Sequence, residues 1–293
     1  MKKKQFDAII KQNLSTIYGE ACFGYVLAKV YDAYYSREAF GAFLSEMQSE
    51  KYAPYYQAYA KGKGSELKEQ PGKYGVTPPK MASVASSSRF CYLALRDGAS
   101  GLGGGSRVQF EHACRIQGIF GTAPQLDAYI PDKNIYVEAK CHEIFDLHTI
   151  KMATKYWDYL YGRGNDFGLP VLERPDTDTF VIPAAVFGID KSHTLFDIKQ
   201  FLCHLLGIAS QKHRAEEASL VYLFFKPKTQ TEDSRKEIDE VFLRLQQEIT
   251  ALFRSAHITA FTAKHNIALS AIAEYAEVME PLTTQNTISL VSV

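Results

Sequence analysis

Cysteine is scarce and unclustered in this chain of 293 residues. Its five cysteines form no Cys-x-x-Cys pair and are widely spaced: Cys22, Cys91, Cys114, Cys141 and Cys203. An odd, scattered set gives little indication of a disulfide framework or a structural zinc site. Reduced thiols of this kind are typical of a cytoplasmic protein, and that is the expected location.

An excess of charge and a long apolar run are also missing. Lys and Arg together number 33, as do Asp and Glu, which excludes a uniformly basic nucleic-acid binder but leaves local basic patches open. The apolar stretches 181–187 and 220–225 are far shorter than the roughly 20 residues that a membrane helix needs. Asp7 and Lys11 interrupt the only signal-like segment, so neither a signal peptide nor a membrane partner is expected.

The composition is that of a globular chain with a real core. Hydrophobic residues make up 46% and aromatic residues 13%, enough for one large or two modest domains. Residues 1–60 show helical spacing of apolar positions, and 61–80 are rich in Lys, Gly and Pro. We therefore expect a helical N-terminal segment and linker over 1–80 and a second unit over 81–293.

Strand and helix patterns alternate after residue 107. The expected strands are 108–116, 125–130, 135–140, 180–189, 220–226 and 258–262. One helix, 83–95, is expected before this region, and four are expected within it: 147–161, 195–208, 235–253 and 268–279. A capping box of Ser234 and Glu237 opens the helix 235–253. This order predicts the α/β class, with a mixed central sheet flanked by helices.

The most informative stretch is 124–140, PQLDAYIPDKNIYVEAK. Its centre, PDKN at 131–134, has the composition of a turn between two strands. Pairing across that turn gives one apolar face of six residues: Leu126, Ala128, Ile130, Ile135, Val137 and Ala139. The other face pairs Gln125 with Lys140, Asp127 with Glu138, and Tyr129 with Tyr136. The hairpin therefore predicts two carboxylates directly opposite each other.

Two carboxylates at that position need a cation between them. Cross-strand Cβ atoms lie about 4.5–5.5 Å apart, so the like charges of Asp127 and Glu138 repel. Lys140 lies on the same face and supplies part of the compensation. A hard divalent ion supplies the rest, since Mg²⁺ prefers carboxylates, a backbone carbonyl such as that of Ala139, and water. An adjacent ammonium suits a site where water attacks a phosphodiester.

These residues resemble the active-site signature of the PD-(D/E)xK nuclease superfamily, which includes restriction endonucleases and RecB-type repair nucleases. The resemblance rests on Pro124-x-x-Asp127 followed by Glu138-Ala139-Lys140. It implies a restriction-endonuclease-like sheet, Asp127 and Glu138 as metal ligands, Lys140 as the catalytic lysine, and cleavage that leaves a 5′-phosphate. The proline spacing differs from the Pro-Asp of the family pattern.

The hairpin distinguishes this acid-x-Lys triplet from the two others in the chain. Glu66-Leu67-Lys68 and Asp197-Ile198-Lys199 also fit that short pattern, but neither is predicted in a strand with an acid opposite it. The competing interpretation of 138–140 is a solvated strand face with an incidental Glu–Lys pair.

Two further residues are candidates for the same site. Glu111 precedes the hairpin by one strand, where many superfamily members carry an additional acid. It is either a third metal ligand, directly or through water, or a surface glutamate on an edge strand. Gln200 and His204 lie one helical turn apart and are similar to the Gln-x-x-x-Tyr of RecB-type nucleases, with His in place of Tyr. The alternative for Gln200 is a polar helix face.

The sequence thus predicts a Mg²⁺-dependent nuclease that hydrolyses DNA, with Mn²⁺ as a substitute ion and a homodimer as a possible assembly for double-strand cutting. The expected catalytic residues are Asp127, Glu138, Lys140, Glu111 and Gln200, and the expected metal ligands are Asp127, Glu138, Ala139 and Glu111. Two alternatives stay open: a nuclease fold that no longer cleaves and serves as a DNA-binding or assembly module, and an unrelated α/β protein whose hairpin is coincidental.

Overall fold

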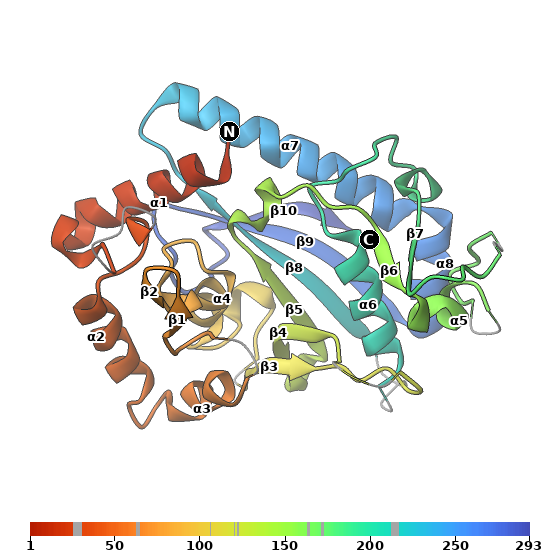
Figure 1. Cartoon of the computed structure of the whole chain (residues 1–293), viewed down its shortest axis with the longest axis horizontal. Helices are drawn as coiled ribbons and strands as arrows, with labels where there is room; N and C mark the ends of the chain where they lie inside the picture. Colours follow the sequence, from red (N-terminus) through yellow and green to blue (C-terminus); the bar gives the residue numbers. More distant parts are fainter. Residues whose placement is uncertain are drawn as a thin grey trace.

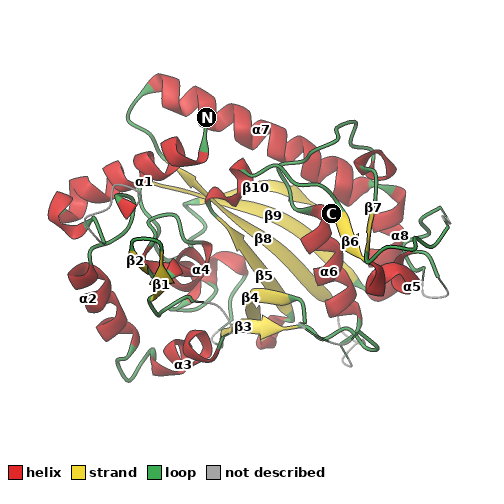
Figure 2. Ribbon diagram, viewed as in Figure 1, coloured by secondary structure: helices red, strands yellow, loops and turns green. Residues whose placement is uncertain are grey.

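A six-stranded mixed sheet forms the centre of the molecule (Figures 1 and 2). The computed structural model describes residues 1–25, 31–62, 65–105, 107–119, 121, 123–162, 165–170, 173–211 and 217–293. Over these residues the strand order is β10-β9-β8-β5-β4-β3. The middle pairs β5–β8 and β8–β9 are parallel, and the outer pairs are antiparallel. The predicted α/β class with a mixed sheet is confirmed, whereas the restriction-endonuclease-like form of that sheet stays a prediction.

The elements have the following bounds. The strands of the central sheet are β3 (Gln109–Ala113), β4 (Gln125–Ile130), β5 (Ile135–Lys140), β8 (Ala218–Pro227), β9 (Ile267–Ala276) and β10 (Thr287–Ser292). Two small hairpins are formed by β1 (Gln70–Gly72) with β2 (Gly75–Thr77), and by β6 (Lys151–Ala153) with β7 (Thr179–Val181). The helices are α1 (Lys3–Tyr18), α2 (Arg37–Met47), α3 (Ala53–Lys61), α4 (Ser87–Leu95), α5 (Trp157–Leu160), α6 (Ile198–Ala209), α7 (Glu232–Arg254) and α8 (Ala256–His265).

Helices cover both faces of the parallel strands. The register places Glu138 of β5 beside Tyr222 of β8, and Tyr222 contacts α6 through His204. Phe225 of β8 points to the opposite face, where its ring lies 5.5 Å from that of Phe90 in α4. Strand β5 is consequently buried on both sides, as expected for a strand within a helix-covered parallel sheet. Charged side chains on β5 therefore need partners inside the protein.

The β4–β5 hairpin has the predicted strand bounds, and residues 128–130 pair with 135–137 in the predicted register. Its turn is a short 3-10 segment at Pro131–Lys133, followed by Asn134 in the left-handed conformation with φ of 49°. Asn tolerates this conformation better than most residues, which explains its place at the end of the turn. The six residues of the predicted apolar face are all buried.

The N-terminal helices pack onto the same hydrophobic core as the sheet. Phe6 of α1 and Tyr59 of α3 belong to one continuous cluster of buried side chains that also contains the strands. Asn13 of α1 donates hydrogen bonds to the backbone carbonyls of Lys228 and Glu277, near the ends of β8 and β9. The predicted helical character of the N-terminal segment is confirmed, and the boundary at residue 80 stays a prediction.

Two predicted elements have the opposite secondary structure. Residues 268–279 were expected to be a helix, but most of them form β9. Buried and half-buried residues alternate along this strand, but alanine stands at positions of both kinds, so the sequence does not show the alternation. Residues 258–262 were expected to be a strand but lie in α8. Ser255 caps that helix by accepting a hydrogen bond from the Ile258 N–H. Tertiary packing outweighs the local preferences of Ala and of β-branched residues here.

Three other boundaries also differ from expectation. The expected helix 147–161 contains the short strand β6 and only one α-helical turn, α5. The expected strand 180–189 ends at Val181, since Pro183 cannot donate a ladder hydrogen bond, and a 3-10 turn follows at Ala184–Phe187. Helix α7 begins earlier than the expected capping box, with Thr231 as its N-cap.

Among the described residues, no helix combines the length and apolar character that crossing a bilayer requires. The five cysteines all carry free thiols, and four of them are buried.

Candidate active site

Three acidic residues lie in one row across neighbouring strands. In the β3–β4 register, Glu111 lies opposite Asp127, between the pairs Phe110–Ala128 and His112–Leu126. Continuing the β4–β5 register places Asp127 opposite Glu138. The row predicted from the hairpin is therefore present in the backbone arrangement, and it extends to β3. Like charges side by side in this way repel unless a proton or a cation compensates them.

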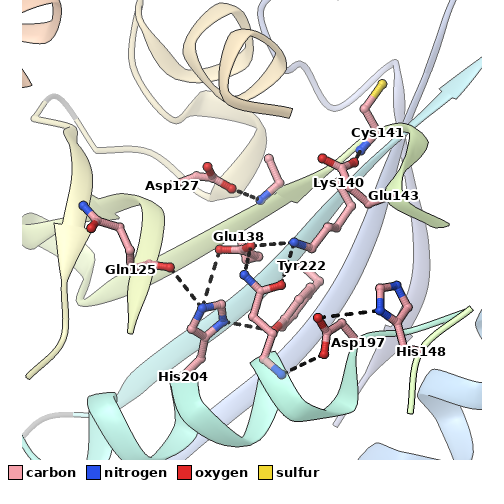
Figure 3. A network of polar contacts seen from close by, with 12 residues as sticks. Gln125, Asp127, Glu138, Lys140, Cys141, Glu143, His148, Asp197, His204 and Tyr222 are labelled. Carbon is pink, nitrogen blue, oxygen red and sulfur yellow. Dashed lines mark hydrogen bonds and ion pairs between the residues drawn. The ribbon is translucent and has the colours of Figure 1, made fainter. Parts of the chain in front are cut away.

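The β4–β5 ladder ends one residue before the expected Asp127–Glu138 pair. The last paired residues are Ala128 and Val137. Beyond them, the Asp127 carboxylate accepts a hydrogen bond from the Ala139 N–H at 2.8 Å. Figure 3 shows the Asp127 side chain turned toward that backbone group rather than toward the Glu138 side chain. The prediction that the two carboxylates face each other as a ladder pair is thus corrected: a side-chain hydrogen bond replaces the backbone pairing.

Glu138, Lys140 and Gln200 form a closed triangle of polar contacts. Lys140 Nζ lies 2.7 Å from Glu138 Oε1 and donates to Gln200 Oε1 at 2.8 Å. The Gln200 amide donates back to Glu138 Oε1 at 2.8 Å. Glu138 is 4% exposed and the Lys140 side chain 14%, so the ion pair is held inside the protein. Figure 3 shows the two charged groups facing each other beneath β5.

The start of helix α6 positions Gln200. Asp197 caps the helix by accepting a hydrogen bond from the Gln200 N–H at 2.9 Å. The acid of the Asp197-Ile198-Lys199 triplet is therefore a helix cap. This agrees with the expectation that the triplet does not lie in a strand opposite another acid. A cavity of about 160 Å³ reaches Lys140 and Gln200 beside this helix start.

His204 connects Glu138 to both neighbouring strands. Its Nε2 lies 3.1 Å from the Gln125 carbonyl and 3.7 Å from Glu138 Oε2, and its Nδ1 lies 3.0 Å from the Tyr222 hydroxyl. Burial lowers the pKa of His204, which favours the neutral ring. Since a carbonyl only accepts, Nε2 carries the proton and Nδ1 accepts from Tyr222. His204 thus bridges β4, β5 and β8 where the β4–β5 ladder ends.

The charged side chains of this region change one another's pKa values. Burial and the neighbouring Glu138 carboxylate raise the pKa of Asp127 well above its ordinary value. Burial alone lowers the pKa of Lys140, but Glu138, Glu143 and Asp127 outweigh it and hold that pKa above its ordinary value. Lys140 therefore stays charged, whereas Asp127 carries an unfavourable negative charge until a proton or another cation compensates it.

Glu111 lies in a strained backbone position beside the buried acid Glu66. Its φ is 57°, in the left-handed region that non-glycine residues seldom adopt. Burial, followed by the Glu66 carboxylate, raises the pKa of Glu111 to about 7. Glu66 is 7% exposed and forms an ion pair with Lys80 at 2.9 Å, while its Oε2 has no hydrogen-bond partner among the described residues. Glu111 is therefore a partly buried acid on the edge strand β3, at the end of the row.

Sequence reasoning missed four contributors to this region. Glu66 and Tyr222 come from segments far away along the chain, and no local pattern connects them to the hairpin. His204 was treated only as a departure from a family pattern. Glu143 accepts a hydrogen bond from the Cys141 N–H, and Lys140, His142 and this bond hold its pKa below the ordinary value despite burial.

The ligand chemistry for a divalent ion is present in part. One Asp127 oxygen accepts from Ala139 and one Glu138 oxygen accepts from Lys140 and Gln200, which leaves a second oxygen on each carboxylate for a cation. Over the described ranges, no group of three or more His, Cys, Asp or Glu side chains is arranged to hold a metal ion. An ion here would have at most the two carboxylates of Asp127 and Glu138 as acidic ligands, and Mg²⁺ would complete its shell with a backbone carbonyl and water.

Comparisons with protein-family models, with curated proteins and with solved structures find no match for this chain.

Proposed function

We propose that the protein is a Mg²⁺-dependent nuclease that hydrolyses DNA phosphodiester bonds, of the PD-(D/E)xK type. The observation that carries the proposal is the buried Lys140, held between Glu138 and Gln200 on the strand next to Asp127. An ammonium and two carboxylates gathered at one sheet position are costly to bury. A catalytic role explains why the chain places them there.

Each residue has a distinct part in the proposed reaction. Asp127 and Glu138 would hold the ion together with the Ala139 carbonyl, and Glu111 completes the acidic row. A bound Mg²⁺ would supply Lewis-acid chemistry to the attacking water and to the leaving 3′-oxygen. Lys140 orients the attacking water and offsets negative charge on the phosphate. Gln200 fixes the positions of both Glu138 and Lys140 through its amide.

The proposal also covers the substrate, the substitute ion, the cellular location and the assembly. The substrate is DNA, Mn²⁺ substitutes for Mg²⁺, and the free thiols suit the cytoplasm. Because one acidic row cuts one strand at a time, double-strand cutting would use a homodimer.

The direct test is a cleavage assay on supercoiled plasmid and on single-stranded DNA. We expect cleavage with Mg²⁺ or Mn²⁺, no cleavage with EDTA, and products with 5′-phosphate ends that a ligase rejoins. Failure to cut either substrate with either ion would instead support the alternative of a nuclease fold that serves as a DNA-binding or assembly module.

A further inference from the structure

A second buried cation lies away from the acidic row. Arg89 of α4 is 8% exposed, and its guanidinium lies between two aromatic rings, 3.9 Å from the ring centre of Tyr35 and 4.2 Å from that of Phe43. The rings attract the cation through their faces and compensate part of its lost hydration. The aromatic rings accept no conventional hydrogen bonds, so the N–H groups of Arg89 need other partners.

The hydrogen bonds of Arg89 are incomplete. Nη1 donates to the Met81 carbonyl at 3.3 Å, and Nε has no hydrogen-bond partner in the part of the chain that the structure describes. Within the described ranges, no carboxylate forms an ion pair with this guanidinium; Glu46, which acts on it electrostatically, pairs with Arg96 at 2.7 Å. Burial lowers the pKa of Arg89, although an arginine stays protonated. The protein thus keeps an uncompensated positive charge in its interior, which costs folding free energy.

Arg89 lines a cavity of about 560 Å³, a volume within the usual range of small-molecule sites. Helices α1, α2 and α4 form its walls, and residues 278–281 close it. Most of the remaining lining is apolar and includes Leu14, Ala42, Leu93, Met279 and Pro281. None of the residues of the acidic row contributes to this cavity.

The other charged groups of the cavity already have partners. Arg96 pairs with Glu46, and the Glu280 carboxylate lies 3.5 Å from the Asn286 side-chain amide. Among the described residues, Arg89 is therefore the one cation of the lining without an ion pair; the Glu280 carboxylate has only the neutral amide of Asn286 as a partner, and the rest of the wall is mostly apolar. A guanidinium matches the paired oxygens of a carboxylate or a phosphate, with two parallel hydrogen bonds.

We propose that this cavity binds a small molecule with one oxyanion group, a carboxylate or a phosphate, on an apolar body, and that Arg89 is the residue that binds the oxyanion. The aromatic rings of Tyr35 and Phe43 hold the guanidinium in place, so little side-chain freedom is lost on binding. The site is independent of the proposed nuclease reaction, because it shares no residue with the acidic row.

The test uses a matched set of probes on the full chain, measured by calorimetry and thermal shift. Phenyl phosphate and phenylacetate carry the two oxyanions, and phenylacetamide is the uncharged control. We expect at least one anion to bind and raise the melting temperature, with the amide at least tenfold weaker. Arg89→Met should lower the affinity for the anion at least tenfold, Arg89→Lys should lower it less, and Arg37→Met, at an exposed arginine paired with Glu69, should leave it unchanged.

A measurement without ligand separates binding from packing. If Arg89 is kept for a ligand at a cost to stability, Arg89→Met should melt at the wild-type temperature or higher. The proposal is overturned if neither anion binds at millimolar concentration, or if Arg89→Met binds the anion as well as wild type. A lower melting temperature for Arg89→Met, without anion binding to wild type, would show that Arg89 serves packing alone.

Discussion

Two buried cations in this molecule are treated in opposite ways. Lys140 has a carboxylate at 2.7 Å and an amide oxygen at 2.8 Å, both from the protein itself. Arg89 has two aromatic rings and one backbone carbonyl, and no carboxylate within the described residues pairs with it. Burying either cation costs desolvation free energy, but only Lys140 has a carboxylate of the protein, within the described residues, that offsets this cost.

The difference indicates what each group is for. A buried cation paired with a carboxylate of the protein is held at a fixed position, as the proposed catalytic role of Lys140 requires. A buried cation with incomplete hydrogen bonds beside a cavity is prepared for a ligand that brings the missing charge. The following predictions test this comparison, from the largest expected effect to the smallest.

The first prediction removes the partnered cation. Lys140→Met keeps most of the side-chain volume and loses the ammonium, so we expect DNA cleavage to fall by about 10⁴-fold or more. Far-UV circular dichroism should show the fold retained. Lys133→Met, in the turn of the same hairpin, is the matched control and should cleave normally. Normal cleavage by Lys140→Met would remove Lys140 from the mechanism.

The second prediction concerns a buried acid without a cation. Glu274 of β9 is fully buried, its Oε2 has no partner among the described residues, and burial raises its pKa to about 8 from an ordinary value of 4.5. Because the folded-state pKa is the higher one, the folded protein holds a proton that the unfolded chain has lost. Stability should therefore fall as the pH rises from about 4.5 to about 8, by at most about 5 kcal/mol.

Glu274→Gln mimics the protonated side chain and should remove this pH dependence. Urea unfolding of both proteins at pH 5, 7 and 9 measures it, with Glu277→Gln as the control. Parallel stability curves for wild type and Glu274→Gln would show that Glu274 is ionised in the folded protein throughout, and so compensated in a way that its surroundings do not explain.

The third prediction concerns Tyr222, which contacts the cluster of Glu138, Lys140 and Gln200 through His204. Tyr222→Phe removes the donor to His204 Nδ1 and leaves a buried acceptor unsatisfied, which should cost about 1–3 kcal/mol of stability. Cleavage should fall by less than about tenfold, since Glu138 keeps its contacts with Lys140 and Gln200. Denaturant unfolding measures the first effect, and Tyr74→Phe at an exposed tyrosine is the control.

The hairpin shows what a single sequence can predict. The turn residues 131–134 and the strict alternation around them determine both strands, their register and the apolar face, because local chemistry controls all three. The contact between Lys140 and Glu138 follows from their spacing on one strand face. The hairpin therefore yields the acidic residues and the lysine together.

The remainder depends on contacts that no local pattern contains. The sequence of strand β9 predicts a helix because alanine occupies both buried and half-buried positions, which conceals the period-two pattern of burial in the sheet. Glu66 approaches Glu111, and Tyr222 approaches His204, only after distant segments pack together. The missing partner of Arg89 is likewise a property of the folded interior, since the sequence places no restriction on which acid lies beside it.

The most direct test of the account is a calorimetric titration of Mn²⁺ and Mg²⁺ into the wild-type protein and into Asp127→Asn, with Asp132→Asn in the hairpin turn as the control. We predict that wild type and the control bind the ion and that Asp127→Asn binds it at least about tenfold more weakly, because one of the two carboxylates that hold it is lost. Equal affinity in all three proteins, or no binding to any, would contradict the claim that Asp127 and Glu138 share a divalent ion.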